Sequence, residues 1–410
     1  MFDIKSRYKM KPYILALILV FALSVVSCSH TAPPKIEADN NDICMDVTDD
    51  TAVESEIPEL EAERNEEIIK LLSRVSDDYV CESVPTDRRY MAWTYNNSLY
   101  LSFIRSPVEL NFETGKTQLI CRDPLCSHEN QECVSSGYYY SFYIEDGVLY
   151  TISGYSVDGA GFRFIGELDP EAGTIKILKE WPGAMTGNSL SLECHDGFIY
   201  YARPTSETTN ELYRYSIKTQ KEEKLSSLDE YIVVFTVYDN IVYFRNSYGI
   251  MKFAPLDFSE VTEIDTGVSI IFPRDGYLYY FVNSYDSSNK LDGYDLMRKP
   301  LSDINLPAVT VIEKVNNPSQ TLYDKGSFYY TPFNYNNDKK LYSYNTATGI
   351  TTEFNLNYGT ECVAMAVVED IIILQFYTEF DENNEREIEY YLYDTTTNEM
   401  FFLVKDCLSY

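Results

Sequence analysis

One short pattern recurs seven times between residue 88 and the C-terminus of this 410-residue chain. Each copy has an apolar segment, a turn with Gly, Asn or Asp, and a second apolar segment that carries Tyr in six of the copies. The turns with the residues that follow them are NSLY at 97–100, GVLY at 147–150, GFIY at 197–200, NIVY at 240–243, GYLY at 276–279, GSFY at 326–329 and the more degenerate DIII at 370–373. Such a chain must fold as repeated small units.

Each copy is predicted to contain two β-hairpins. Asp-Gly dipeptides supply the positive φ angles of a tight antiparallel turn, and they stand at 146–147, 196–197 and 275–276. A second hairpin is expected where a Tyr-rich segment precedes a further polar turn, as at 211–221, 340–349 and 390–398. Two hairpins make four strands per copy.

The spacing of the copies predicts how they assemble. Successive turns stand 50, 50, 43, 36, 50 and 44 residues apart, and four-stranded propeller blades repeat every ~40 to 50 residues. One blade cannot bury both faces, whereas a ring of blades buries them against one another. We therefore expect an all-β fold, a seven-bladed β-propeller, over residues 79–410. Because the fourth copy is short and the seventh lacks Tyr, six or eight blades stay open, as do a solenoid and two stacked sandwiches.

Composition narrows the classes of partner. Lys and Arg number 33 against 64 Asp and Glu, a formal net charge of −31, which argues against nucleic acid or any partner held through phosphates. Hydrophobic residues make up 45% of the chain, enough to fold. The 37 Tyr and 21 Phe against 2 Trp favour β-structure.

Residues 1–27 have the pattern of a secretory signal. Four basic side chains precede an apolar run at 14–26, which is shorter than the about 20 residues that a membrane-spanning helix needs. The end of this run, Val25-Val26-Ser27-Cys28, resembles the lipobox of bacterial lipoproteins. The resemblance implies an acylated Cys28, for instance with palmitate, and an extracytoplasmic protein anchored to the cell membrane or envelope. The alternative is a plain secretion signal with an incidental cysteine.

Two further segments precede the repeats. Residues 28–57 are rich in Asp, Asn and Pro and predict an acidic, flexible tether. Residues 58–78 predict a short amphipathic helix, because its apolar positions follow an i, i+3, i+4, i+7 spacing at Ile68, Leu71, Leu72 and Val75. Such a stripe usually packs on its own domain; docking to a partner is the alternative.

The segment from Cys121 to Cys133 resembles a C-x-D-P-L-C-x-H-x(4)-C signature of uncharacterised propeller lipoproteins of Gram-positive anaerobes. The Gly-x-Ile-Tyr-Tyr and Leu-Tyr-x-Tyr units are similar to DUF5050 and TolB-like propeller repeats. The likeness covers residues 88–406. It implies a fold and a location only, because the family carries no agreed activity.

Apart from Cys28, the chain has eight cysteines, and an even number outside the cytoplasm suggests disulfides. Cys126 and Cys133 flank a short loop and are the easiest pair to close. Cys81 and Cys407 flank the first and last blades, so they could meet in a closed ring. The other candidates are Cys44, Cys121, Cys194 and Cys362.

The alternative use of these cysteines is structural zinc, held by Cys121, Cys126, His128 and Cys133. Zinc ligands usually have two to four residues between them, whereas one residue separates Cys126 from His128. The spacing and an oxidising exterior therefore favour disulfides, and no cofactor is predicted.

Nothing in the sequence marks a catalytic residue. It has no G-x-S-x-G elbow and no phosphate-binding loop, and we expect surface roles for its three histidines, His30, His128 and His195. The sequence favours a binding or scaffolding module for an unidentified protein, peptide, glycan or envelope partner. The alternative is a propeller enzyme, a glycan hydrolase or lyase that uses two carboxylates at the mouth of the channel.

Overall fold

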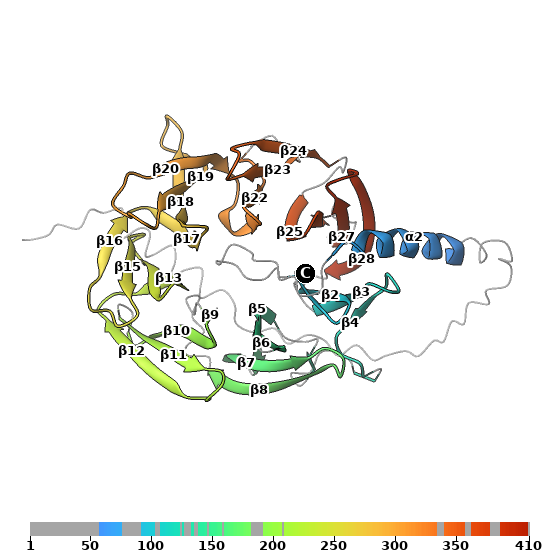
Figure 1. Ribbon diagram of the computed structural model, residues 1–410, viewed down its shortest axis with the longest axis horizontal. Coiled ribbons are helices and arrows are strands. Elements are labelled where there is room, and N and C mark those ends of the chain that lie inside the picture. The colour runs from blue at the N-terminus through green and yellow to red at the C-terminus, as the bar shows by residue number, and fades with distance from the viewer. Residues whose placement is uncertain are drawn as a thin grey trace, which may run out of the picture. The chain divides into compact units, whose positions relative to one another are not determined.

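The fold is a seven-bladed β-propeller, as the repeat predicts. The computed structural model describes residues 57–75, 92–102, 107–123, 125–126, 133–134, 138–145, 147–157, 160–181, 192–206, 209–333, 340–356, 362–377 and 386–408. Within them, seven antiparallel sheets of four strands each form a ring (Figure 1). The described helix, α2 (Ile57–Leu72), precedes the sheets.

Each blade consists of four strands that are consecutive in the chain. Blade 1 has β1 (Ala92–Tyr95), β2 (Ser98–Ser102), β3 (Pro107–Asn111) and β4 (Thr117–Leu119). Blade 2 has β5 (Tyr138–Glu145), β6 (Val148–Val157), β7 (Ala160–Asp169) and β8 (Thr174–Trp181). Blade 3 has β9 (Leu192–His195), β10 (Phe198–Pro204), β11 (Asn210–Ser216) and β12 (Glu222–Leu228). Blade 4 has β13 (Ile232–Tyr238), β14 (Ile241–Asn246), β15 (Met251–Pro255) and β16 (Thr262–Asp265).

The remaining three blades follow the same order. Blade 5 has β17 (Val268–Arg274), β18 (Tyr277–Tyr285), β19 (Leu291–Pro300) and β20 (Val309–Val315). Blade 6, which follows the 3-10 helix η3 (Pro318–Gln320), has β21 (Leu322–Asp324), β22 (Ser327–Tyr330), β23 (Lys340–Asn345) and β24 (Thr351–Asn355). Blade 7 has β25 (Cys362–Val368), β26 (Ile371–Tyr377), β27 (Arg386–Asp394) and β28 (Glu399–Leu408).

The repeated tyrosines serve mainly as core. They lie on the second strand of their blades, and those with an exposed fraction of 4% or less are Tyr100, Tyr200, Tyr243 and Tyr279. The turns before them adopt the left-handed backbone that the sequence predicts, for example at Asp196 (φ 47°) and Gly197 (φ 73°). The motif thus combines the turn of a hairpin with a large side chain that packs in the core of the propeller.

Among the strands that the structure describes, none is exchanged between the first and last blades. Each blade is made of described strands that are consecutive in the chain, so these strands of the first and last blades share no sheet. Their inner strands, β1 and β25, contact each other. A single apolar cluster also joins the two blades, with Leu99 and Leu110 from blade 1 and Ile371 and Ile373 from blade 7.

Helix α2 packs at the seam, the junction between blades 1 and 7. Its predicted apolar stripe of Ile68, Leu71, Leu72 and Val75 is at most 8% exposed and lies in the same cluster. The helix lies beside β28 and the strands of blade 1 in Figure 1. The stripe therefore packs on the chain's own propeller.

Polar contacts hold the end of the helix on blade 7. Arg74 lies 2.7 Å from the Asp394 carboxylate and donates to the Thr396 hydroxyl at 2.9 Å. Burial raises the pKa of Asp394, but hydrogen bonds from Thr396 and the Arg74 guanidinium outweigh it, and the net pKa is lowered. On the blade 1 side, the helix carbonyl of Asn65 lies against Gly115 in the turn between β3 and β4.

In the described part of the chain, no helix is both long and apolar enough to cross a membrane. The predicted signal and its Cys28, the predicted tether up to residue 56, and Cys44 and Cys81 lie outside the described residues. The predictions made for them stay predictions.

Candidate functional site

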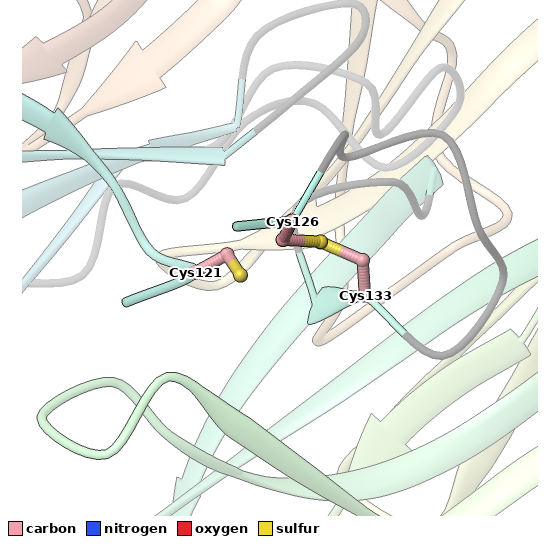
Figure 2. A group of neighbouring side chains, drawn as sticks. All are labelled: Cys121, Cys126 and Cys133. Carbon is pink, nitrogen blue, oxygen red and sulfur yellow. The ribbon is translucent and has the colours of Figure 1, made fainter. Parts of the chain in front are cut away.

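Three of the predicted cysteines meet at the connection between blades 1 and 2. The sulfur atoms of Cys121, Cys126 and Cys133 all lie within 4.8 Å of one another (Figure 2). Cys121 follows β4. A turn in which the Leu125 N–H donates to the Asp123 carboxylate, at 2.9 Å, then brings Cys126 back toward it.

This grouping is compatible with both chemistries that the sequence proposes. Zinc–sulfur bonds of about 2.3 Å place thiolates roughly 4 Å apart, and a Cys126–Cys133 disulfide with Cys121 beside it would occupy the same space. His128, the fourth ligand of the zinc hypothesis, lies outside the described residues. The choice between disulfide and zinc stays a prediction.

The other candidates are spread around the ring. Cys194, Cys362 and Cys407 lie in β9, β25 and β28, and their pairing is untested. His195 ends β9, 3.4 Å from the Asp196 carboxylate in the adjacent turn.

A cavity of about 790 Å³ lies between blades 5 and 6. Its walls come from the turns that follow β17, β21 and β23 and from residues of β18 and β19. Three cations line it, Arg274, Arg298 and Lys325, together with the carboxylates Asp275 and Asp324. In a chain with a net charge of −31, a concave site with more cations than anions is a candidate binding site.

Contacts within blade 6 and between blades hold the walls of this pocket in place. The Tyr323 hydroxyl of blade 6 donates to the Asp275 carboxylate of blade 5. The Thr346 hydroxyl donates to the Gly326 carbonyl at 2.8 Å, and Lys325 forms an ion pair with Glu369 of blade 7. A site with walls fixed in this way loses little conformational entropy when it binds.

Arg298 is one of the three cations that line the pocket. Its guanidinium stacks over the Tyr277 ring, 4.7 Å from the centroid. Burial raises the pKa of the adjacent Tyr279 hydroxyl, against the opposing effect of a hydrogen bond with Arg298. The hydroxyl therefore stays neutral at physiological pH and can act as a hydrogen-bond donor or acceptor.

The sequence reasoning missed this pocket. Its residues are separated by up to 73 positions, from Arg274 to Ala347, and those that belong to the repeat, such as Asp275 and Tyr279, are assigned by the sequence to hairpin turns and strand packing. One available signal was the alignment of the copies with each other, since Arg298 occupies the place in blade 5 that Arg214 occupies in blade 3.

No protein-family model and no curated protein matches the chain. Among solved structures, a prolyl endopeptidase is 11% identical to this chain. The match covers 88% of this chain and 57% of the endopeptidase, with a TM-score of 0.50. Oligogalacturonate lyase from Vibrio parahaemolyticus is 12% identical, with 81% and 90% covered and a TM-score of 0.47. The β-propeller domain of the Trilobed protease from Pyrococcus furiosus is 11% identical, with 64% and 82% covered and a TM-score of 0.44. At such identities the likeness extends to the propeller fold alone.

Proposed function

We propose that this chain is a lipid-anchored, extracytoplasmic β-propeller that binds a ligand in the pocket between blades 5 and 6. The observation that carries the binding role is the pocket itself, in which the guanidinium of Arg298, tyrosine rings and turn residues of two blades meet around a cavity of about 790 Å³. Loops and turns held by a rigid scaffold are the usual place for recognition.

The anchoring and location rest on the resemblance of residues 25–28 to a lipobox. The test is metabolic labelling of the full chain with a palmitate analogue in a bacterial host, comparing the natural sequence with Cys28→Ala. We expect labelling and membrane association to be lost in the variant. Labelling that persists without Cys28 would refute the anchor.

The binding role is tested with the full chain, purified in detergent, on arrays of glycans and of peptides. The natural protein is compared with Arg298→Gln, which removes the cation and keeps a polar side chain of similar length. We expect binding to at least one class of ligand that the substitution weakens. If every ligand found is indifferent to residue 298, the pocket is not the binding site.

An enzyme on the same scaffold is the second candidate. Asp275 and Asp324 come from different blades and line one cavity, and paired carboxylates can serve glycan cleavage. Recovering the array ligands after incubation distinguishes the two functions. Intact ligand supports binding, whereas cleaved ligand, lost in Asp275→Asn or Asp324→Asn, supports the enzyme.

A further inference from the structure

Blades 3 and 5 contain the same arrangement of an arginine over an aromatic ring. In blade 3, Arg214 pairs across the sheet with Tyr200 and lies 4.8 Å from the centroid of the Phe198 ring. In blade 5, Arg298 pairs in the same way with Tyr279 and lies 4.7 Å from the centroid of the Tyr277 ring. The repeat thus places a guanidinium at the same position of both blades.

The outermost strand differs between these blades. In blade 3, Arg214 stands opposite Glu223 and donates to its carboxylate from Nε at 2.8 Å and from Nη2 at 2.7 Å. In blade 5, Arg298 stands opposite Val309, which is 57% exposed. Among the residues that the structure describes, no carboxylate forms an ion pair with Arg298. The blade 3 arginine is neutralised within the sheet, and the blade 5 arginine is not.

The guanidinium of Arg298 is also exposed to a cavity, because it lines the pocket between blades 5 and 6. A guanidinium presents its N–H groups in a planar fork that matches a carboxylate and binds it through charge-assisted hydrogen bonds. Stacking on Tyr277 fixes the plane of this fork. An anionic group bound in the pocket would take the place that Glu223 takes in blade 3.

The rest of the lining narrows the chemistry of the ligand. Asp275 and Asp324 also line the pocket. The same carboxylates accept hydrogen bonds from hydroxyl groups, and the Tyr279 hydroxyl adds a neutral polar group. A ligand that carries one carboxylate and several hydroxyls satisfies all of these groups, whereas an acidic peptide has few hydroxyls to offer.

We propose that the pocket binds an acidic sugar, with Arg298 holding its carboxylate and Asp275 and Asp324 accepting from its hydroxyls. This inference rests on the proposed binding function of the same pocket. A cavity of about 790 Å³ has room for a mono- or disaccharide.

The test is calorimetric titration of the full chain in detergent with a disaccharide of glucuronic acid and N-acetylglucosamine. The comparison ligand is the same disaccharide with its carboxylate reduced to an alcohol. We expect the reduced ligand to bind at least about tenfold more weakly, the range of a lost charge-assisted hydrogen bond. A third ligand, a tripeptide ending in glutamate, is expected to bind more weakly than the uronate.

The decisive variant is Val309→Glu, which supplies blade 5 with the acid that blade 3 has and leaves Arg298 in place. Since Val309 is exposed, we expect an unchanged thermal unfolding midpoint and a loss of about tenfold in uronate affinity. Arg298→Gln should lose a similar factor. The matched control is Glu223→Val in blade 3, which should leave the affinity of the pocket unchanged.

The outcomes separate the two proposals. Equal binding of the acidic and reduced sugars, or an affinity that Val309→Glu does not change, overturns the acidic-sugar inference and leaves a binding pocket. Tighter binding of the glutamate peptide overturns it in favour of a peptide ligand. If no glycan or peptide on the arrays depends on residue 298, the binding function of the pocket fails as well.

Discussion

Substitution of Gly115 by Ala tests whether helix α2 seals the ring. Gly115 lies in the turn between β3 and β4 with φ +64°, and a Cβ added there would lie 2.7 Å from the Asn65 carbonyl of the helix. Gly349 lies in the same turn of blade 6 with φ +71°, where a Cβ would meet only the Tyr344 hydroxyl, at 3.9 Å. Gly349→Ala is therefore a matched control.

The local structure of the two turns is the same. The Gly115 N–H donates to the Asn111 carbonyl at 2.9 Å, and the Gly349 N–H donates to the Asn345 carbonyl at 2.8 Å. In both substitutions an alanine must adopt the left-handed backbone, which costs roughly 1–2 kcal/mol. At residue 115 the new methyl must also displace the helix, and overpacking of this kind costs about 1–3 kcal/mol more.

Urea unfolding followed by tryptophan fluorescence measures the difference in stability, because the two tryptophans, Trp93 and Trp181, are buried in blades 1 and 2 and report on unfolding of the propeller. Hydrogen exchange shows which residues lose protection in each variant. We expect Gly115→Ala to lose more stability than Gly349→Ala and to speed exchange in residues 57–75. Equal losses, or unchanged exchange in the helix, would show that α2 does not hold the seam.

Other measurements follow from the same contacts. Leu72→Ala should cost about 2–5 kcal/mol in urea unfolding, because Leu72 is fully buried between the helix and the two terminal blades; a loss below about 0.5 kcal/mol, the usual scatter of surface substitutions, would contradict it. The folded pKa of Asp394 is lowered, so the native state binds fewer protons there than the unfolded chain. Its stabilisation is present above about pH 3.9 and is lost as the pH falls through the folded pKa. In Asp394→Asn the dependence of stability on pH below 4 should be shallower, and an unaltered slope would argue against the Arg74 contact. Mass spectrometry of peptides digested without reductant should find Cys126 linked to Cys133; zinc that co-purifies and is lost in Cys126→Ser would favour the metal hypothesis.

The turns of the outer hairpins show how much of the fold could be predicted. Residues with positive φ recur at the same point of this turn, as Gly115, Gly173, Gln220, Gly349 and Asn398. This geometry is local: it depends on a few neighbouring residues and on their hydrogen bonds. The number of blades and their order follow from counting such units, which is why the predicted seven-bladed ring is confirmed.

The helix shows an intermediate case. The spacing of Ile68, Leu71 and Leu72 predicts an amphipathic helix, but it does not identify the surface that covers the stripe. The structure places that surface at the junction of blades 1 and 7, which lie at opposite ends of the chain. A hydrophobic stripe predicts that the helix is buried along one face, but any apolar surface of suitable shape can cover that face.

The sequence by itself determined the repeating unit and the all-β class, and it favoured seven blades and strand packing for the repeated tyrosines, because turn geometry and strand alternation are set by residues close together in the chain. Only the tertiary structure decided which cysteine sulfurs meet, where α2 binds, and that Arg298 lines a pocket while Arg214 is neutralised. These features depend on which side chains of one blade reach the next. The packing of whole sheets around the ring sets the distances between side chains of neighbouring blades, and no short segment of the sequence encodes these distances.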